Sequence, residues 1–277
     1  MNFLKPIELA YRGINRARRA LYRAGVLRAK RLPRPVISVG NIAIGGAGKT
    51  PAVIRIGRHF LEHGLRVAVL TRGYGRADPS VTGVVDALDA ARWGDEPVLI
   101  KKHLVNADVL VGSNRHQNAV QYLREKDCDL FLLDDGFQHL QLARDADVVI
   151  DVPGARLHRE GRSALRDATF VLPRKLRLAV PPELKRVFAF AGLANNEQFF
   201  AALRAAGLDV AGTRGFPDHH RYTAEDLATL RRDANGATLV TTEKDFVKLE
   251  DRDIIPILAE FEIEPDVLQR LLHLARS

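Results

Sequence analysis

The chain of 277 residues is long enough for one or two compact domains, and its 46% hydrophobic and 27% charged residues are typical of a globular protein. A single cysteine, Cys128, excludes an internal disulfide and a metal centre built from several thiolates. The net charge of +8 is concentrated in residues 1–34, which contain ten Lys or Arg and one acid, Glu8. This asymmetry favours an anionic partner met by one segment over a nucleic acid bound across the folded body.

The same N-terminal segment, residues 1–34, has apolar residues at helical spacing, among them Ala10, Ile14, Ala17 and Leu21, with arginines between them. It lacks the roughly 18 apolar residues in a row that a spanning helix needs, and it lacks the pattern of a secretory signal. We expect a basic amphipathic helix that lies on an anionic membrane surface. The alternative is a helix that packs on the body of the protein and leaves a charged face in water.

From residue 36 onward, short apolar runs alternate with helical segments. Strands are expected at 36–39, 67–70, 109–111, 130–133 and 148–150, and helices at 49–63 and 115–126. This alternation predicts an α/β fold with a mostly parallel sheet covered by helices on both faces. A boundary is expected at 178–182, followed by strands at 187–190 and 238–242 and a helix at 197–206. The interpretation is a first domain at 35–183 and a smaller α/β domain at 184–277.

A glycine-rich segment follows the first expected strand directly and opens the first expected helix; it is Gly45-Gly46-Ala47-Gly48-Lys49-Thr50. Glycines allow several backbone N–H groups to approach a phosphate at the N-terminus of a helix. Lys49 is expected to reach the β- and γ-phosphates, and the Thr50 hydroxyl is expected to bind Mg²⁺. The strict pattern has glycine where this chain has Ala43, but strand, loop and helix come in the required order. The first domain is therefore predicted to be of the P-loop NTPase type.

A second signal is the apolar run at 130–133, which ends in Asp134 and Asp135. Carboxylates at the C-terminal edge of a parallel sheet lie where a P-loop protein keeps its magnesium-side acid. Adjacent side chains point in different directions, so one of the two is expected to face the metal directly. His139 follows near the same edge, where a histidine by itself is more often structural.

Two further clusters are polar. Asp95 begins an expected helix, where an aspartate is commonplace as a cap, although its carboxylate could lie over the phosphates. Residues 216–220 end in His219 and His220, and adjacent histidines do not readily converge on one metal ion. A hydrogen-bonded Asp/His catalytic pair explains such a cluster more economically.

The ordered set of these motifs resembles the tetraacyldisaccharide 4'-kinases, the lipid A 4'-kinases of Gram-negative bacteria. The matching blocks lie at 39–42 with the glycine loop and Pro51, and at 71–76, 94–97, 134–139, 191–195, 216–220 and 242–245. The resemblance implies transfer of the γ-phosphate of ATP, with Mg²⁺, to the 4'-hydroxyl of tetraacyldisaccharide 1-phosphate, the lipid A precursor. It also implies a peripheral enzyme at the cytoplasmic face of the inner membrane, which agrees with the basic N-terminal segment.

The same resemblance assigns roles to individual residues. It implies that Asp95 activates the attacking hydroxyl with His219 as its partner, and that Arg115 lies near the transferred phosphoryl group. Lys49 and Thr50 match the phosphate and magnesium groups. The magnesium edge consists of three residues, Asp134, Asp135 and His139.

One loop departs from the family pattern, and two other functions stay open. The family's Leu-Pro-Ala-Gly-Pro-Leu-Arg-Glu-like loop aligns with 157–167, where Gly161, Leu165 and Arg166 are kept and Asp167 replaces Glu. The alternatives are a P-loop kinase for another amphiphilic sugar and a membrane-bound nucleotide switch. A switch needs no base for an acceptor hydroxyl, so the expected Asp/His pair argues against it. The sequence indicates no oligomeric state.

Overall fold

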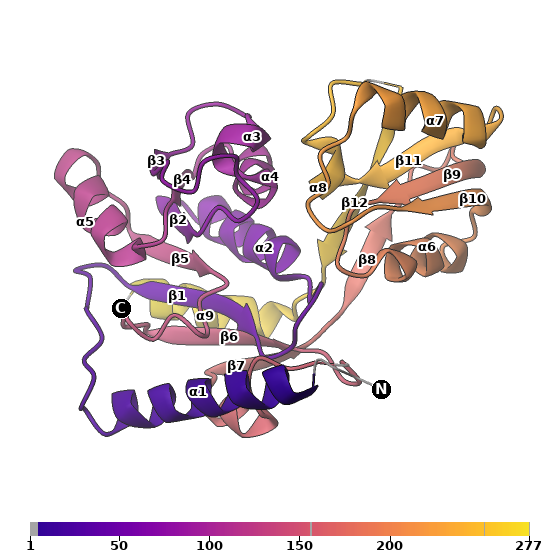
Figure 1. The fold of residues 1–277 in the computed structure, drawn as a ribbon. Coiled ribbons are helices and arrows are strands. Elements are labelled where there is room, and N and C mark those ends of the chain that lie inside the picture. Colours follow the sequence, from indigo (N-terminus) through magenta and orange to yellow (C-terminus); the bar gives the residue numbers. More distant parts are fainter. Residues whose placement is uncertain (1–4, 156, 252, 277) are drawn as a thin grey trace.

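The computed structural model describes residues 5–155, 157–251 and 253–276, which form two α/β bodies with a long helix beneath the first (Figure 1). The first body is built on a seven-stranded sheet in the order β3-β4-β2-β5-β1-β6-β7. All neighbouring strands in it are parallel except β3 and β4. The expected α/β fold with a mostly parallel sheet is confirmed.

From residue 36 onward, the elements of the first body follow the expected ranges to within two residues wherever a strand or helix was expected. The helix expected within residues 1–34 ends earlier, at Arg23, and residues 1–4 lie outside the described residues. The strands are β1 (Val36–Asn41), β2 (Val67–Thr71), β3 (Gly83–Val84), β4 (Asp108–Val111), β5 (Leu130–Asp134), β6 (Ala146–Asp151) and β7 (Phe170–Pro173). The helices are α1 (Lys5–Arg23), α2 (Lys49–Glu62), α3 (Ala90–Trp93), α4 (Asp95–His103), α5 (Arg115–Glu125) and the short 3₁₀ helix η1 (Arg162–Asp167).

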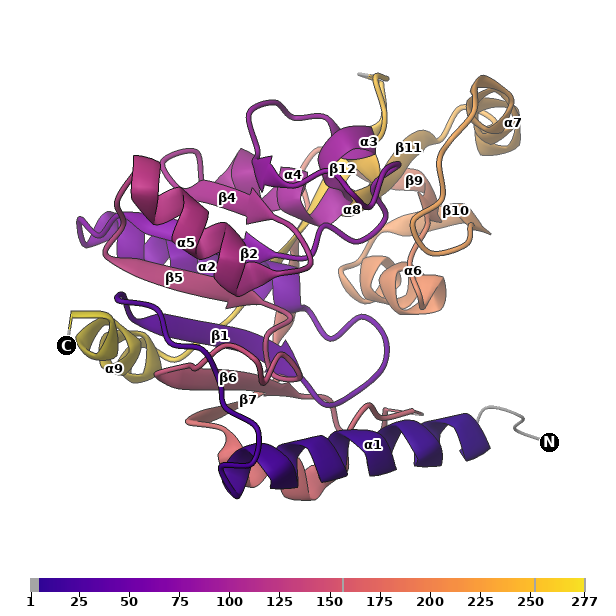
Figure 2. The same ribbon diagram turned by 60° about the vertical axis from the view of Figure 1, so that its left-hand side comes forward.

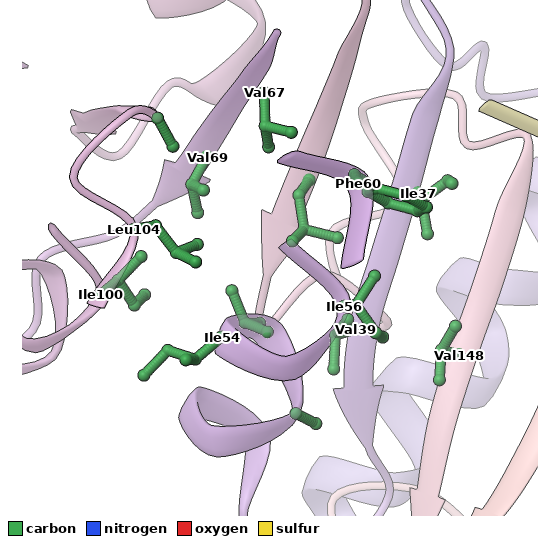
Figure 3. Close-up of a cluster of buried hydrophobic side chains, with 14 of the residues drawn as sticks. Ile37, Val39, Ile54, Ile56, Phe60, Val67, Val69, Ile100, Leu104 and Val148 are labelled. Atoms are coloured by element: carbon green, nitrogen blue, oxygen red, sulfur yellow. The ribbon is translucent and has the colours of Figure 1, made fainter. Parts of the chain in front are cut away.

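Alternating strand residues divide the apolar side chains between the two faces of the first sheet. On one face Ile37 and Val69 pack against Ile56 and Phe60 of α2 (Figure 3). On the other face Phe131 belongs to a separate buried cluster that includes residues of α5. Because the central strands are parallel, their carboxyl ends meet at one edge, and α2 begins there.

The second body is built on a five-stranded sheet in the order β10-β9-β11-β12-β8. Its elements are β8 (Leu176–Ala179), β9 (Arg186–Ala191), α6 (Asn196–Ala205), β10 (Asp209–Gly215), α7 (Ala224–Ala234), β11 (Thr238–Thr242), α8 (Glu243–Phe246) and β12 (Ile255–Phe261). Strand β8 pairs with β12 in antiparallel fashion. The boundary expected after residue 183 therefore falls after the chain has already entered the second sheet.

Helix α9 (Pro265–Arg276) follows the second body in sequence but packs on the first. Leu268, Leu271 and Leu272 are buried in the same cluster as α2, and Arg276 Nη2 donates a hydrogen bond to the His63 carbonyl at 3.1 Å. An amphipathic helix needs an apolar partner, and the open face beside α2 supplies it. The sequence placed this helix in the second domain at 184–277, whereas in the structure it packs on the first body.

Helix α1 turns its polar side toward the first body. Asn15 and Arg19 are 4% and 6% exposed, whereas Leu9, Ile14 and Leu21 are 65%, 59% and 42% exposed. Both ribbon views place α1 along the β6 and β7 side of the first sheet (Figure 2). Among the described helices, none combines the length and apolar character needed to cross a membrane.

Part of the basic charge of residues 1–34 is engaged by the body, which the sequence did not indicate. Ion pairs join Arg19 and Arg23 to Asp167, and the loop arginines Arg31 and Arg34 pair with other acids of the first body. The helix does pack on the body, but through its polar face rather than with its charged face in water. Its apolar face is exposed, and contact of that face with a membrane stays a prediction.

We predict that Leu271→Ala destabilises the protein by about 2–5 kcal/mol, because Leu271 is fully buried against the first body. Leu88→Ala, at a residue that is 58% exposed, is the matched control and should change the free energy of unfolding by less than about 0.5 kcal/mol. Chemical denaturation measures both. Equal effects would contradict the assignment of α9 to the first core.

Candidate active site

A cleft of about 1170 Å³ lies at the carboxyl edge of the first sheet and is closed on one side by the second body. The first body contributes the glycine loop at 45–48, Lys49, Asp134 and Asp135. The second body contributes His219, Lys244 and much of β12. Two residues of α1, Glu8 and Tyr11, also line this cleft, so three separate parts of the chain surround it.

The glycine loop ends at the N-terminus of α2 in a conformation that favours glycine. Gly45 and Gly48 have φ angles of +111° and +83°, and Gly48 is the residue that caps α2. The first turn of α2 contains no acid, so its N–H groups and dipole are available to an anion. Lys49 Nζ lies 3.5 Å from Asn41 Oδ1 and 3.5 Å from Asp135 Oδ1. This geometry fits phosphate groups beside Lys49.

The two adjacent aspartates differ in their surroundings. Thr71 donates a hydrogen bond to Asp134 Oδ2 at 3.1 Å, whereas the buried Asp134 Oδ1 has no hydrogen-bond partner. Burial, together with the negative charges of Glu96 and Asp135, raises the pKa of Asp134 to about 7. Burial also raises the pKa of Asp135, but Lys49 and Arg159 outweigh it and lower that pKa.

An unpartnered, buried carboxylate oxygen beside other acids suits a cation. Among the described residues there is no group of three or more His, Cys, Asp or Glu side chains that could hold a metal on its own. The donor set at Asp134, with Thr50 at the start of α2, therefore fits Mg²⁺ held jointly with phosphate oxygens, as is usual for this ion.

The surroundings of His139 differ from those of the two aspartates. It is not among the residues that line the cleft, and burial with the charges of Arg115 and Arg144 lowers its pKa to about 4. The charges that act most strongly on His139 are those of arginines, and its place at the magnesium edge stays a prediction. Its backbone carbonyl accepts a hydrogen bond from Arg144.

Arg115 begins α5 at the carboxyl end of β4 and is 8% exposed. Its Nη1 donates to the Ser113 carbonyl at 3.1 Å, but its buried Nε has no acceptor. Burial and the nearby charge of Arg72 lower the pKa of Arg115. Two neighbouring guanidinium groups, one of them with an unsatisfied donor, are suited to an anion.

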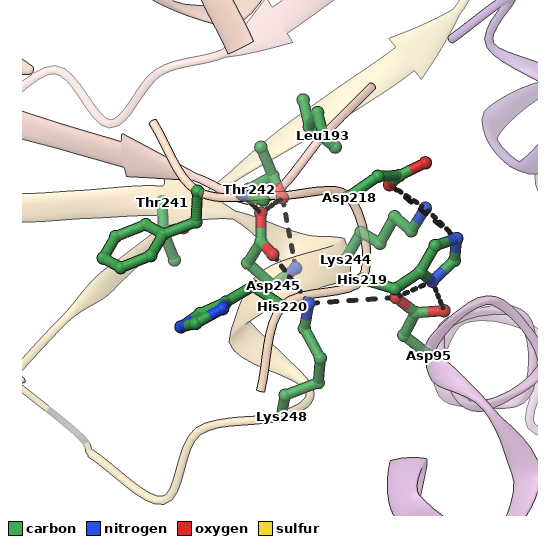
Figure 4. A network of polar contacts seen from close by, with 12 residues as sticks. Asp95, Leu193, Asp218, His219, His220, Thr241, Thr242, Lys244, Asp245 and Lys248 are labelled. Atoms are coloured by element: carbon green, nitrogen blue, oxygen red, sulfur yellow. Dashed lines mark hydrogen bonds and ion pairs between the residues drawn. The ribbon is translucent and has the colours of Figure 1, made fainter. Parts of the chain in front are cut away.

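Asp95 and His219 form the contact that the sequence suggested, although they come from different bodies. His219 Nδ1 lies 3.0 and 2.9 Å from the two carboxylate oxygens of Asp95 (Figure 4). Asp95 is 3% exposed at the start of α4, and His219 has a φ of +60°, a strained conformation for a residue with a side chain. Strain of this kind is often found at functional sites.

Positive charges from the second body surround this pair. Lys244 Nζ lies 3.2 Å from His219 Nε2, and Lys248 Nζ lies 3.9 Å from Asp95 Oδ2. Burial alone raises the pKa of Asp95, but the hydrogen bond from His219 and the charges of Lys244 and Lys248 outweigh it and lower the pKa. Lys248 is itself held by the fully buried Asp245 at 2.8 Å.

Neither lysine is singled out by the sequence as a site residue, although Lys244 lies in one of the matching sequence blocks. The structure also places two other residues at the site that the sequence did not indicate. Arg159 Nη1 donates to both carboxylate oxygens of Asp135 at 2.9 and 2.8 Å, and the neighbouring Glu160 is 4% exposed.

The site has the parts of a P-loop phosphotransferase. A strand leads through a glycine loop into a helix that begins with Lys and Thr, and paired carboxylates lie beside it at the carboxyl edge of a parallel sheet. The sequence matches the family of tetraacyldisaccharide-1-P 4'-kinases over residues 1–172 and 174–276. The chain belongs to this family.

Named relatives and a solved structure agree with this assignment. A tetraacyldisaccharide 4'-kinase of Anaeromyxobacter sp. strain K is 37% identical over 97% of this chain and 89% of its own length. One from Pelobacter propionicus is 35% identical over 90% and 83%. The crystal structure of LpxK from Aquifex aeolicus in complex with ATP is 28% identical, covers 98% of this chain and 96% of its own, and superposes with a TM-score of 0.77.

We predict that Asp95→Asn lowers the free energy of unfolding by about 2 kcal/mol at pH 7, because buried cationic groups lose a carboxylate. Folding lowers the pKa of Asp95, so the ionised carboxylate stabilises the folded state. This stabilisation is fully present above the pKa of the unfolded state, about 3.9, and is lost as the pH falls through the pKa of the folded state. The difference between variant and wild type should therefore shrink below about pH 4. Urea denaturation across pH tests this, and a difference that stays constant would contradict it. Asp233→Asn, in an exposed ion pair, is the control.

Proposed function

We propose that the protein transfers the γ-phosphate of ATP to the 4'-hydroxyl of tetraacyldisaccharide 1-phosphate, the lipid A precursor. The observation that carries this proposal is a cleft lined by both the phosphate-binding loop and His219, which contacts the buried Asp95 at 2.9 Å, within a member of this kinase family. A nucleotide switch would need the loop but has no use for the pair. The ATP complex of the Aquifex aeolicus relative supports ATP as the donor.

Mg²⁺ would be held by Thr50 and Asp134 together with phosphate oxygens, and when bound it neutralises charge on the transferring group. Lys49 lies where it can neutralise the β- and γ-phosphates. Arg115 is not among the residues that line the cleft, but it adds a positive charge near Asp134 and Asp135. These groups stabilise charge that builds up during transfer, and fixed charges in a partly dry cleft act strongly.

The Asp95–His219 pair is the base in this proposal. As the 4'-oxygen forms its bond to the γ-phosphorus, the bond from that phosphorus to the β–γ bridging oxygen breaks. The proton of the hydroxyl passes to a carboxylate oxygen of Asp95, because both ring nitrogens of His219 already have partners. Lys244 donates to His219 Nε2, so the imidazole proton in the resting state lies on Nδ1, toward Asp95. Lys244 and Lys248 favour the ionised carboxylate, which keeps the pair ready to accept a proton.

Peripheral association with the cytoplasmic face of the inner membrane is part of the same proposal. The outward face of α1 carries Leu9, Ile14 and Leu21, and exposed Arg16 lies on the same helix. Tyr11 of this helix lines the cleft, so an acyl chain held in a bilayer beside α1 has a short path to the reacting groups. Apolar and cationic groups on one surface are typical of helices at anionic interfaces.

We predict that Lys49→Ala lowers phosphate transfer from ATP to tetraacyldisaccharide 1-phosphate by at least about 100-fold while the protein stays folded. Labelled ATP with purified acceptor in detergent measures the reaction, and circular dichroism checks the fold. Lys185→Ala, at an exposed lysine of the second body, is the control and should retain activity. Near-normal transfer by folded Lys49→Ala would exclude the assigned phosphate site. Wild-type transfer only to acceptors without this disaccharide would point to another amphiphilic sugar.

We predict that Leu9→Ser combined with Ile14→Ser weakens binding to anionic vesicles by about 10-fold or more, because each exposed side chain loses apolar burial in the bilayer. Wild-type binding should also weaken as salt rises, since the arginines attract anionic lipid through a screened interaction. Vesicle sedimentation measures both effects. Leu88→Ser, at an exposed leucine away from α1, is the control. Unchanged binding by the double variant would contradict an interfacial role for α1.

A further inference from the structure

The inward face of α1 holds one short segment, His158–Glu160, which we call the strap. Glu8 accepts a hydrogen bond from the His158 backbone N–H at 3.0 Å, and Asn15 Nδ2 donates to the Arg159 carbonyl at 3.0 Å. Arg19 binds both carboxylate oxygens of Glu160 at 2.8 Å each. These three contacts are spread along α1, so the helix binds the whole length of the strap.

The other side of the strap contacts the active site directly. The Arg159 side chain makes the two hydrogen bonds to Asp135, and its backbone N–H donates to the Ile42 carbonyl at 2.7 Å, just before the glycine loop. Gln138 Nε2 donates to Glu160 Oε1 at 3.0 Å and to the Asn41 carbonyl at 2.9 Å. The strap thus links α1 to the ends of β1 and β5.

Arg19 makes this connection rigid. It also donates to the Phe137 carbonyl at 3.2 Å, and its guanidinium stacks 4.3 Å from the centre of the Phe137 ring. Arg19 and Glu160 are 6% and 4% exposed, so neither can exchange its partner for water without moving. A guanidinium that makes two parallel hydrogen bonds to a carboxylate fixes the orientation of that carboxylate as well as neutralising its charge.

We propose that Arg19, acting through Glu160, and Asn15, acting through Arg159, are positioning residues that hold Asp135 in place for turnover. This inference rests on the proposed function, because Asp135 lies 3.5 Å from Lys49 and directly follows Asp134, the residues proposed to hold phosphate and Mg²⁺. Helix α1 is then part of the catalytic apparatus as well as a surface for lipid. An anchor alone would require its apolar face to be exposed, but it would not require a buried ion pair ending at the catalytic edge.

The decisive variant is the double substitution Arg19→Met with Glu160→Gln. It removes the Arg19–Glu160 ion pair without changing net charge and leaves neither of these two positions charged. Asp167, the other acid paired with Arg19, keeps its ion pair with Arg23. The Glu160→Gln change also keeps a side-chain oxygen that can accept from Gln138. The matched control is Arg16→Met with Glu225→Gln, which removes one exposed Arg of α1 and one exposed Glu of α7. Asn15→Ala, which removes one neutral hydrogen bond, is the milder companion.

In detergent, where vesicle binding plays no part, the double variant should lose about tenfold in kcat, and its apparent requirement for Mg²⁺ should rise by a similar factor. The KM for ATP at saturating Mg²⁺ should stay within about twofold, because the glycine loop is intact. Asn15→Ala should show the same pattern with a smaller change. The control should match wild type in each respect.

A second readout needs no acceptor: binding of a fluorescent ATP analogue titrated with Mg²⁺. The double variant should need more Mg²⁺ for half-maximal affinity, and this measurement stands even if the wild type fails to phosphorylate the disaccharide. Wild-type kcat and wild-type Mg²⁺ dependence in a folded double variant would overturn the inference and leave α1 as an anchor. Should the double variant fail to fold, Asn15→Ala decides in the same way, and wild-type behaviour by it overturns the inference.

Discussion

Parallel strand pairing is the constraint on which the rest of this structure depends. Strands β1, β2, β4 and β5 end at one edge of the sheet, so the residues that follow them meet there although they are far apart in sequence. The glycine loop follows β1, Arg72 follows β2, Arg115 lies just beyond β4, and Asp134 ends β5. The edge therefore brings together a glycine loop, cationic side chains and a buried acid, because each of them directly follows or ends a strand.

The buried carboxylate of Asp95 meets its partner from the second body. Asp95 and His219 are 124 positions apart in sequence, yet their side chains contact at 3.0 Å. Lys244 and Lys248 accompany His219 and offset the cost of burying the Asp95 carboxylate. Asp245 holds Lys248 and also accepts from the Gly192 backbone N–H at 3.0 Å, which ties the lysine to the end of β9. The electrostatic state of the acid in one body is thus set by residues of the other.

The sequence predicted those elements whose structure depends on residues close together in the chain. The runs around Ile37, Val69 and Phe131 have the length and composition of buried strands, and each forms one. The glycine loop and Asp134 were found because their chemistry follows directly from a strand.

Features that depend on distant partners were missed. The strap was not predicted because Arg159 and Glu160 acquire their roles only through partners on α1 and after β5. Likewise, the sequence places α9 in the second domain, because an apolar helix face indicates burial but not which surface it packs on. The magnesium role of His139 came from the family resemblance and stays a prediction, and the sequence did not indicate the arginines that lower its pKa.

Helix α9 has a consequence for how the molecule is made. The chain leaves the first body after β7, builds the whole second body, and only then returns to fill the face beside α2. Domains usually fold as units while the chain emerges from the ribosome, N-terminal parts first. Here the nucleotide-binding body stays incomplete, with an apolar face of its core uncovered, until synthesis has passed β12. The two bodies must therefore mature together, and a nascent chain that stalls within the second one exposes the unfinished core of the first.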